Sequence, residues 1–142
     1  MKASARNQFS GQITAIQDGT VNDEVELQTA SGLRVVATVT RASRDTLGLR
    51  VGANVVALVK ASSVVLVTDA GGVRFSARNQ FQGTVSQVTL GAVNSEVALT
   101  LADGELLVAI VTNESADGLG LSAGQTATAL FKAGSVILGV AA

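Results

Sequence analysis

The chain contains one sequence twice, at an offset of 72 residues. Residues 4–70 align with residues 76–142 without a gap, and 33 of the 67 aligned positions are identical. The hexapeptide Ser-Ala-Arg-Asn-Gln-Phe opens both copies unchanged. Such self-similarity indicates two copies of one structural unit. We therefore expect two small domains, the first over residues 1–70 and the second over residues 73–142.

Each copy is expected to consist mostly of β-strands. Short runs rich in Val, Ile and Leu alternate with polar residues, which is the pattern of half-buried strands. Glycine-containing turns separate the runs: Asp103-Gly104 is a strong hairpin signal, and Ser31-Gly32 is its counterpart. The strands expected in the first copy span residues 9–16, 21–27, 33–39, 55–60 and 64–67.

One short helix is expected in each copy, between the third and fourth strands. Thr40 and Thr112 suit the N-cap of such a helix, and Gly48 and Gly120 suit the left-handed residue at its end. Five short strands with a helix at this place are typical of a small Greek-key barrel of the OB type. The sequence therefore predicts a mainly β protein with two tandem OB-type five-stranded Greek-key barrels, each with one short helix.

Size and composition favour an oligomer. A domain of about 70 residues buries too little apolar surface to be more than marginally stable alone. Only 3% of the residues are aromatic, so the core must be aliphatic, and no cysteine is present to form a disulfide or a thiolate metal site. Association with further copies of the chain remains as a source of stability, so we expect a homo-oligomer.

The charges are scattered along the chain and sum to a net charge of −1. No basic run suggests contact with nucleic acid. The N-terminal residues lack the apolar stretch of a signal peptide, and no apolar run approaches the length of a membrane span. We expect a soluble cytoplasmic protein that contacts neither nucleic acid nor a membrane.

Comparison of the two copies singles out two basic residues in each. From residue 76 onward the only basic residues are Arg78 and Lys132, which align with Arg6 and Lys60, whereas four further arginines of the first copy have no basic counterpart. The retained segments, Ser-x-Arg-Asn and Lys-Ala, offer hydroxyl, guanidinium, amide and ammonium donors and contain no carboxylate. Such donors suit a dianion, because charge-assisted hydrogen bonds are strong and a carboxylate would repel the ligand.

Structural interpretations of the same residues stay open. Arg6 and Arg78 could be surface side chains, or could pair with Glu24 and Glu96 at a subunit contact. The retained lysines stand at the end of an apolar run, where a long side chain often lies along apolar surface. The two threonines could serve only as helix caps.

Three motifs in order resemble those of the molbindins, small OB-type domains that bind molybdate and tungstate. They are the Ser-Ala-Arg-Asn-Gln opening, the Gly-x-Val-Asn-x-Glu-Val segment and the Lys-Ala-x-x-Val segment, and each occurs in both copies. The resemblance covers the whole chain and implies a two-domain molbindin. It also implies a homotrimer with six domains in all, with oxyanions bound at the interfaces between domains.

The resemblance further implies which residues bind the oxyanion. The first copy would contribute Ser4, Arg6, Asn7, Thr40, Lys60, Ala61 and Ser62. The second copy would contribute Ser76, Arg78, Asn79, Thr112, Lys132, Ala133 and Gly134, where a glycine replaces the hydroxyl of the first copy. A second class of site near the symmetry axis would be lined by Val21, Asn22, Val93 and Asn94. The two asparagines of this second set could equally be turn residues.

The expected function is binding of molybdate or tungstate for storage or homeostasis, with no covalent cofactor and no metal ligands. An OB-fold that binds single-stranded nucleic acid is an alternative, but it needs stacking aromatics and a basic groove, and the chain has four phenylalanines and no Trp or Tyr. A purely structural oligomer is another alternative. An enzyme is not expected, because the chain has no His or Cys and no pair of carboxylates suited to acid–base catalysis recurs in both copies.

Overall fold

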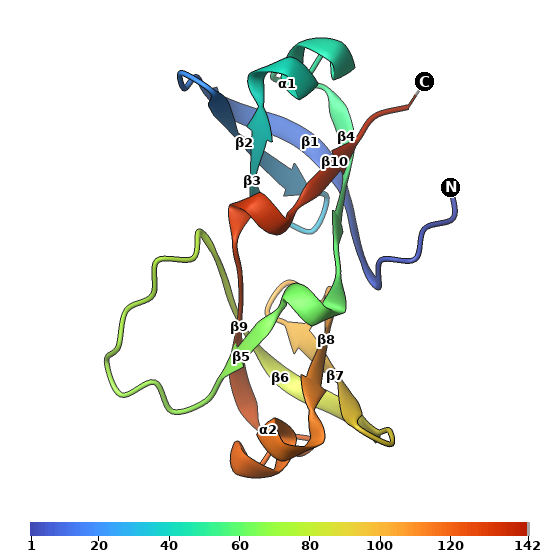
Figure 1. The fold of residues 1–142 in the computed structure, drawn as a ribbon, viewed down its shortest axis with the longest axis vertical. Helices are drawn as coiled ribbons and strands as arrows, with labels where there is room; N and C mark the ends of the chain where they lie inside the picture. Colours follow the sequence, from blue (N-terminus) through green and yellow to red (C-terminus); the bar gives the residue numbers. More distant parts are fainter. Residues whose placement is uncertain (142) are drawn as a thin grey trace. The chain divides into compact units, whose positions relative to one another are not determined.

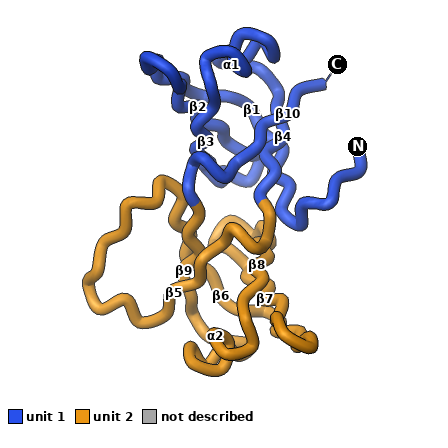
Figure 2. Tube along the Cα trace, in the orientation of Figure 1, with its two compact units in different colours: residues 1–59, 132–142 blue, residues 60–131 orange. Residues whose placement is uncertain are grey.

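A computed structural model describes residues 1–141 and shows a mainly β chain with two compact units (Figures 1 and 2). Each unit has one five-stranded antiparallel sheet, curled into an OB-type barrel, with one short α-helix and one 3₁₀ turn. The predicted fold class is confirmed. Ala142, the last residue of the second expected domain, lies outside the described residues.

Unit 1 comprises residues 1–59 and the described residues from 132 onward. Its strands lie in the order β10-β4-β1-β2-β3. They are β1 (Asn7–Gln17), β2 (Asn22–Thr29), β3 (Arg34–Thr40), β4 (Asn54–Val59) and β10 (Ile137–Gly139), with helix α1 (Arg41–Leu47) and 3₁₀ turn η2 (Ala133–Ser135).

Unit 2 comprises residues 60–131 and has the equivalent strand order, β5-β9-β6-β7-β8. Its elements are β6 (Asn79–Leu90), β7 (Asn94–Leu101), β8 (Leu106–Thr112), β9 (Thr126–Phe131) and β5 (Val65–Val67), with helix α2 (Asn113–Gly118) and 3₁₀ turn η1 (Ala61–Ser63).

The two compact units do not coincide with the two sequence copies, because the short last strands are exchanged. β10, at the end of the second copy, pairs with β4 of the first copy, with Leu138 opposite Ala57. β5, at the end of the first copy, pairs with β9 of the second, with Leu66 opposite Ala129. Each 3₁₀ turn accompanies its strand, so η2 packs against β3 and η1 against β8. Each barrel is thus completed by a segment of the other copy.

Alternation of buried and outward-facing residues along most strands builds the two cores. In β2, Val25 and Leu27 are fully buried while the flanking polar residues face outward, as expected for strands with one solvated face. The exchanged strand β10 adds Leu138 to the core of unit 1, and β5 adds Leu66 to the core of unit 2. The exchanged segments are therefore part of the hydrophobic core, and their removal would expose it.

The long first strand of each barrel bends at a defined place. The register between β1 and β2 shifts between Ile13 and Ala15, which is a bulge that lets the strand curl. Just before it, Gly11 allows close approach, since a Cβ there would lie 2.4 Å from the carbonyl oxygen of Gln28. β6 repeats the bulge at the equivalent place, with Gly83 in the role of Gly11.

Both helices begin as predicted. The hydroxyls of Thr40 and Thr112 each accept a hydrogen bond at 3.0 Å from the backbone N–H three residues later. The first helix ends at Gly48 in the left-handed conformation, with φ of 65°. The last helical residue of α2 is Gly118, and Gly120, as expected, is left-handed, with φ of 62°. Across residues 1–141, no helix has the length and apolar character that crossing a membrane requires.

Candidate functional site

The retained asparagines begin the long first strand of each copy, and the paired strand ends just before the retained lysine. Asn7, the first residue of β1, lies opposite Val59, the last residue of β4, and Lys60 follows directly. In the second copy, Asn79 likewise lies opposite the residue before Lys132. Antiparallel pairing thus places each asparagine opposite the residue that precedes the retained lysine. Arg6 and Asn7 belong to unit 1, whereas Lys60 and Ala61 belong to unit 2.

In these segments the charged and hydroxyl groups face outward and the asparagines face inward. The Asn7 and Asn79 side chains are only 2% and 1% exposed. No buried side-chain nitrogen or oxygen in the described part of the chain lacks a hydrogen-bond partner. The two asparagines therefore anchor the segment to the barrel. The exposed members are Ser4, Arg6, Lys60, Ser76, Arg78 and Lys132.

Lys60 and Lys132 each begin a 3₁₀ turn. Their carbonyls accept hydrogen bonds from the N–H three residues later, at 2.9 and 3.0 Å. The alanine after each lysine, Ala61 or Ala133, is buried, which fixes the turn to the barrel. The next residue, Ser62 or Gly134, is exposed.

The structure does not place Thr40 beside Arg6 within unit 1. Thr40 ends β3 opposite Asn22, at the start of β2 and near the far end of β1. That end is separated from Asn7 by the whole length of β1. This strand has 11 residues, which corresponds to roughly 35 Å of extended chain. Figure 1 shows α1, which follows Thr40, at the end of unit 1 away from the start of β1. Thr112 is placed equivalently in unit 2, so neither predicted set of seven residues meets within one unit.

The residues of the second predicted class lie on the loop between the first two strands of each barrel. Val21 and Val93 are 70% and 71% exposed. Asn94 lines a hollow of about 320 Å³ in unit 2, together with Ser95 and Glu96. The loops thus present an apolar side chain and an amide to solvent in both units.

Beneath this loop, unit 1 contains an ion-pair cluster that the sequence analysis missed. The Asp23 side chain has no exposed surface, and Arg41 donates from Nε to its Oδ2 at 2.9 Å. Arg44 donates to the same carboxylate at 3.2 Å and also binds Asp18. The backbone N–H of Gly19 donates to Oδ1 at 2.9 Å. The Gly19 N–H, followed by Arg41, lowers the pKa of Asp23 to about 2, so its carboxylate is charged at neutral pH.

Arg41 also binds the loop itself. Its Nη2 donates to the Gly19 carbonyl at 2.7 Å, and its backbone N–H donates to the Val21 carbonyl at 3.0 Å. Unit 2 has Asn113 at this position, and its Nδ2 and backbone N–H donate to the two equivalent carbonyls, both at 2.9 Å. Ser95, which replaces the buried aspartate, donates from Oγ to Oδ1 of Asn113. The comparison of copies missed these residues because it looked for identity, and their types differ.

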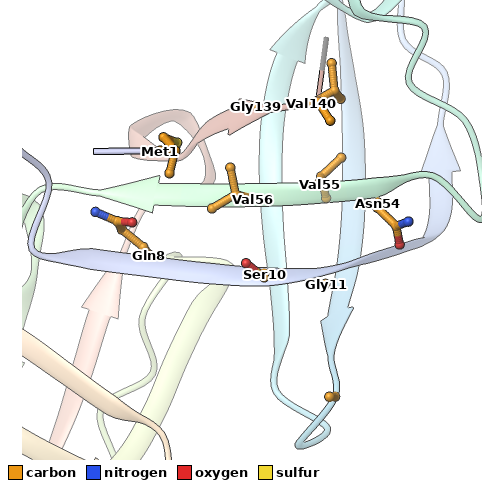
Figure 3. A pocket seen from close by; sticks show the side chains of 11 residues that line it. Met1, Gln8, Ser10, Gly11, Asn54, Val55, Val56, Gly139 and Val140 are labelled. Carbon is orange, nitrogen blue, oxygen red and sulfur yellow. The ribbon is translucent and has the colours of Figure 1, made fainter. Parts of the chain in front are cut away.

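A larger hollow, of about 690 Å³, lies on unit 1 over β1 and β4 (Figure 3). Gln8 and Ser10 of β1 and Val56 of β4 face it, with Val140 from the segment after β10. Its lining has no charged side chain and none of the predicted oxyanion ligands. A dianion placed there would have no charged side chain as a partner, so this hollow does not suit the predicted ligand.

Comparison with known proteins agrees with this architecture. The sequence matches the TOBE domain model twice, over residues 3–66 and 76–138. The chain therefore belongs to the TOBE family and carries two such domains in tandem.

Within that family the chain is of the two-domain molbindin type. A crystal structure of the cytoplasmic molybdate-binding protein ModG, with molybdate bound, matches it with a TM-score of 0.95 and 47% sequence identity. That match covers 99% of this chain and 100% of the ModG chain. The predicted family is confirmed.

Two curated relatives extend the comparison. The molybdenum transport protein ModE of Herbaspirillum seropedicae is 52% identical over 140 residues, and the molybdenum-pterin-binding protein MopA of Rhodobacter capsulatus is 43% identical over 138 residues. These alignments cover 99% and 97% of this chain but 52% of each relative. The chain spans about half the length of the curated relatives it matches.

Proposed function

We propose that the chain binds molybdate, or the similar tungstate, at pockets that are completed when several copies of the chain associate. One observation carries this proposal: in both copies, antiparallel pairing sets the asparagine of the Arg-Asn segment opposite the residue that precedes the Lys-Ala segment. These segments hold the only basic residues that the two copies share at aligned positions. Retention of this pair while the other charges change supports a ligand that both copies share.

The chemistry of the joined segments suits a tetrahedral dianion. Arg6 and Lys60 supply positive charge, and Ser4 and Ser62 supply hydroxyl donors, while the buried asparagine and alanine hold the two segments in place. Guanidinium and ammonium donors make the stronger, charge-assisted kind of hydrogen bond. The equivalent set of the second copy has Gly134 in place of the second serine, and we propose that its pocket binds less tightly.

No single unit supplies the whole predicted pocket, because each Lys-Ala segment belongs to the other unit from its Arg-Asn segment and Thr40 and Thr112 lie away from the start of β1 and β6. Each sits at the far end of its barrel, on an exposed helix cap. We propose that another copy of the chain brings its Thr40 or Thr112 to the Arg-Lys pair, in a homotrimer with six domains. The small aliphatic cores and the exposed Val21 and Val93 favour such an assembly.

The same features support a cytoplasmic storage or homeostasis role and speak against the alternatives. ModG, which matches over its whole length, is a cytoplasmic molybdate-binding protein. Phe9 and Phe131 are buried, and Phe81 packs on Phe131 with ring centroids 5.7 Å apart, so these rings do not form a stacking surface for nucleic acid. The sequence has no His or Cys to act as a base or nucleophile, which favours binding over catalysis.

Isothermal titration calorimetry of the purified protein with molybdate tests the proposal, with sulfate and phosphate titrated in parallel. We expect tight binding of molybdate and weak or absent heat with the other two anions. The double variant Arg6→Ala/Arg78→Ala should lose most of that heat. Arg34→Ala is the matched control, because Arg34 is exposed and its counterpart in the second copy is a leucine.

Two outcomes would reject the proposal in different ways. Absence of heat with every oxyanion would leave the shared Arg-Lys pair as a subunit contact, which is the structural alternative. Full retention of binding in Arg6→Ala/Arg78→Ala would place the oxyanion elsewhere. Analytical ultracentrifugation of the same samples reports whether the chain is a trimer.

A further inference from the structure

The loops that carry Val21-Asn22 and Val93-Asn94 are fixed in the same way in both units. In each, the first residue of the short helix uses its side chain to bind the carbonyl of the loop glycine and its backbone N–H to bind the carbonyl of the loop valine. The four donor–acceptor distances lie between 2.7 and 3.0 Å. We call this arrangement the loop clamp.

The chemistry of the loop clamp differs completely between the units. Unit 1 uses a charged side chain, Arg41, held by the buried carboxylate of Asp23. Unit 2 uses a neutral amide, Asn113, held by the buried hydroxyl of Ser95. The loop motif Gly-x-Val-Asn is identical in the two copies, although both supporting residues have changed. The hydrogen bonds to the two loop carbonyls are kept although both supporting residues differ, so we infer that the loop requires them.

Because of the clamp, two carbonyls of each loop accept hydrogen bonds, whereas two backbone N–H groups of the loop remain exposed. The carbonyls of Gly19 and Val21 point to the clamp. Thr20 and Val21 are exposed, and within residues 1–141 their backbone N–H groups donate to no other group of the chain. The equivalent residues of unit 2, Ala92 and Val93, show the same pattern. Exposed N–H groups beside engaged carbonyls favour an anion over a cation.

We propose that Arg41 in unit 1 and Asn113 in unit 2 are positioning residues that hold these loops open to an oxyanion, one by a charged clamp and the other by a neutral one. This inference rests on the proposed oxyanion-binding function and assigns residues to its second class of site. In both units the clamp adds no net charge beneath the loop: the Asp23 carboxylate is balanced by Arg41, with Asp18 and Arg44 forming a second pair, and the other clamp is uncharged.

The charge balance predicts an unusual pair of variants. Arg41→Asn alone introduces the side chain of unit 2 but sets it against the carboxylate of Asp23, which then keeps only Arg44 as a charged partner beneath a site for an anion. Asp23→Ser/Arg41→Asn transplants the whole clamp of unit 2 into unit 1. The single variant should therefore disturb the position of the loop, and the double variant should restore it, although the double variant differs more from the natural sequence.

Two measurements on the full-length protein test the positioning role. NMR-detected hydrogen exchange of the backbone amide of residue 41, bonded to the Val21 carbonyl, reports the clamp without any oxyanion; the amide of residue 113 is the internal control. We expect Arg41→Asn to speed exchange at residue 41 by about tenfold and the double variant to restore it. In molybdate calorimetry, Arg41→Asn should remove the sites that the loop of unit 1 contributes and leave the sites of the Arg-Lys class unchanged, and the double variant should recover the full stoichiometry.

The results separate this inference from the proposed function. No molybdate heat in the natural protein would reject the proposed function, and the positioning role with it. Normal two-class binding with unchanged exchange in Arg41→Asn would reject the loop clamp alone. Faster exchange with both classes of binding intact would show that the clamp supports only the fold and would overturn the positioning role. Arg50→Ala, which changes an exposed arginine outside the clamp, should alter neither measurement.

Discussion

Leu138 offers a direct test of the strand exchange, because it belongs to the second sequence copy and packs in the first barrel. Its side chain is 7% exposed, and it lies opposite Ala57 of β4. Truncation of a buried leucine to alanine costs about 2–5 kcal/mol. β10 is a three-residue edge strand that can adjust to a cavity, so we expect Leu138→Ala to cost about 2 kcal/mol, the low end of that range. This corresponds to a roughly 30-fold increase in the population of the opened barrel.

Native-state hydrogen exchange read by mass spectrometry shows which barrel opens. We expect Leu138→Ala to lower the protection of peptides from β1 and β4 and to leave those from β6 and β9 unchanged. Leu66→Ala is the matched variant, since Leu66 is the aligned residue, is 6% exposed and lies in β5. It should produce the reverse pattern, with β6 and β9 loosened.

The opposite assignment would refute the exchange. If Leu138→Ala loosened β6 and β9 while β1 and β4 kept their protection, each sequence copy would form its own barrel. Equal loosening of all four strands would show that the barrels open together, and the two units would then not be separate cooperative units of folding.

Further predictions concern the loop clamp, the helix caps and the barrel bend. The pKa of Asp23 is lowered from 3.8 to about 2, so its stabilising contribution is present above about pH 4 and is lost as the pH falls towards 2; Asp23→Ser/Arg41→Asn should flatten this acid limb in urea unfolding curves. Thr40→Ala and Thr112→Ala should each cost about 1 kcal/mol in denaturant unfolding, and the corresponding glycine variants only a few tenths. Gly11→Ala would set a Cβ 2.4 Å from a β2 carbonyl oxygen, and we expect it to lower stability by about 1–3 kcal/mol, measured by thermal unfolding.

The strands and helices were predictable because local chemistry determines them. Period-2 alternation and β-branched runs together identified all five strands of the first copy within a few residues of their observed bounds. Gly32 and Gly104 have positive φ, of 98° and 91°, at the two hairpins that their sequences indicated. Thr40 and Thr112 cap the helices through hydrogen bonds to residues three positions away. Each of these features depends on neighbours in sequence, so the residue pattern contains the necessary information.

The strand exchange was not predictable from the same pattern. Residues 64–67 and 136–139 are equivalent in the repeat, and both contain the buried valine and leucine that a fifth strand needs. Either segment can therefore complete either barrel with the same alternation and the same backbone hydrogen bonds. The choice between the two pairings depends on the path of the connecting segments in space, which periodicity does not describe.

The proposed oxyanion residues and the loop clamp differ in what the repeat reveals of them. Arg6 and Lys60 were selected because each occurs in both copies as the same residue type, which is what a shared ligand would demand of groups that touch it. The clamp needs only a donor to a loop carbonyl and a buried partner for that donor, and Arg-Asp and Asn-Ser both satisfy this need. Residues that act through geometry can thus drift between copies as long as they change together. A covariation of positions 23 and 41 with each other, and of 95 with 113, is the sequence signal that identity alone overlooks.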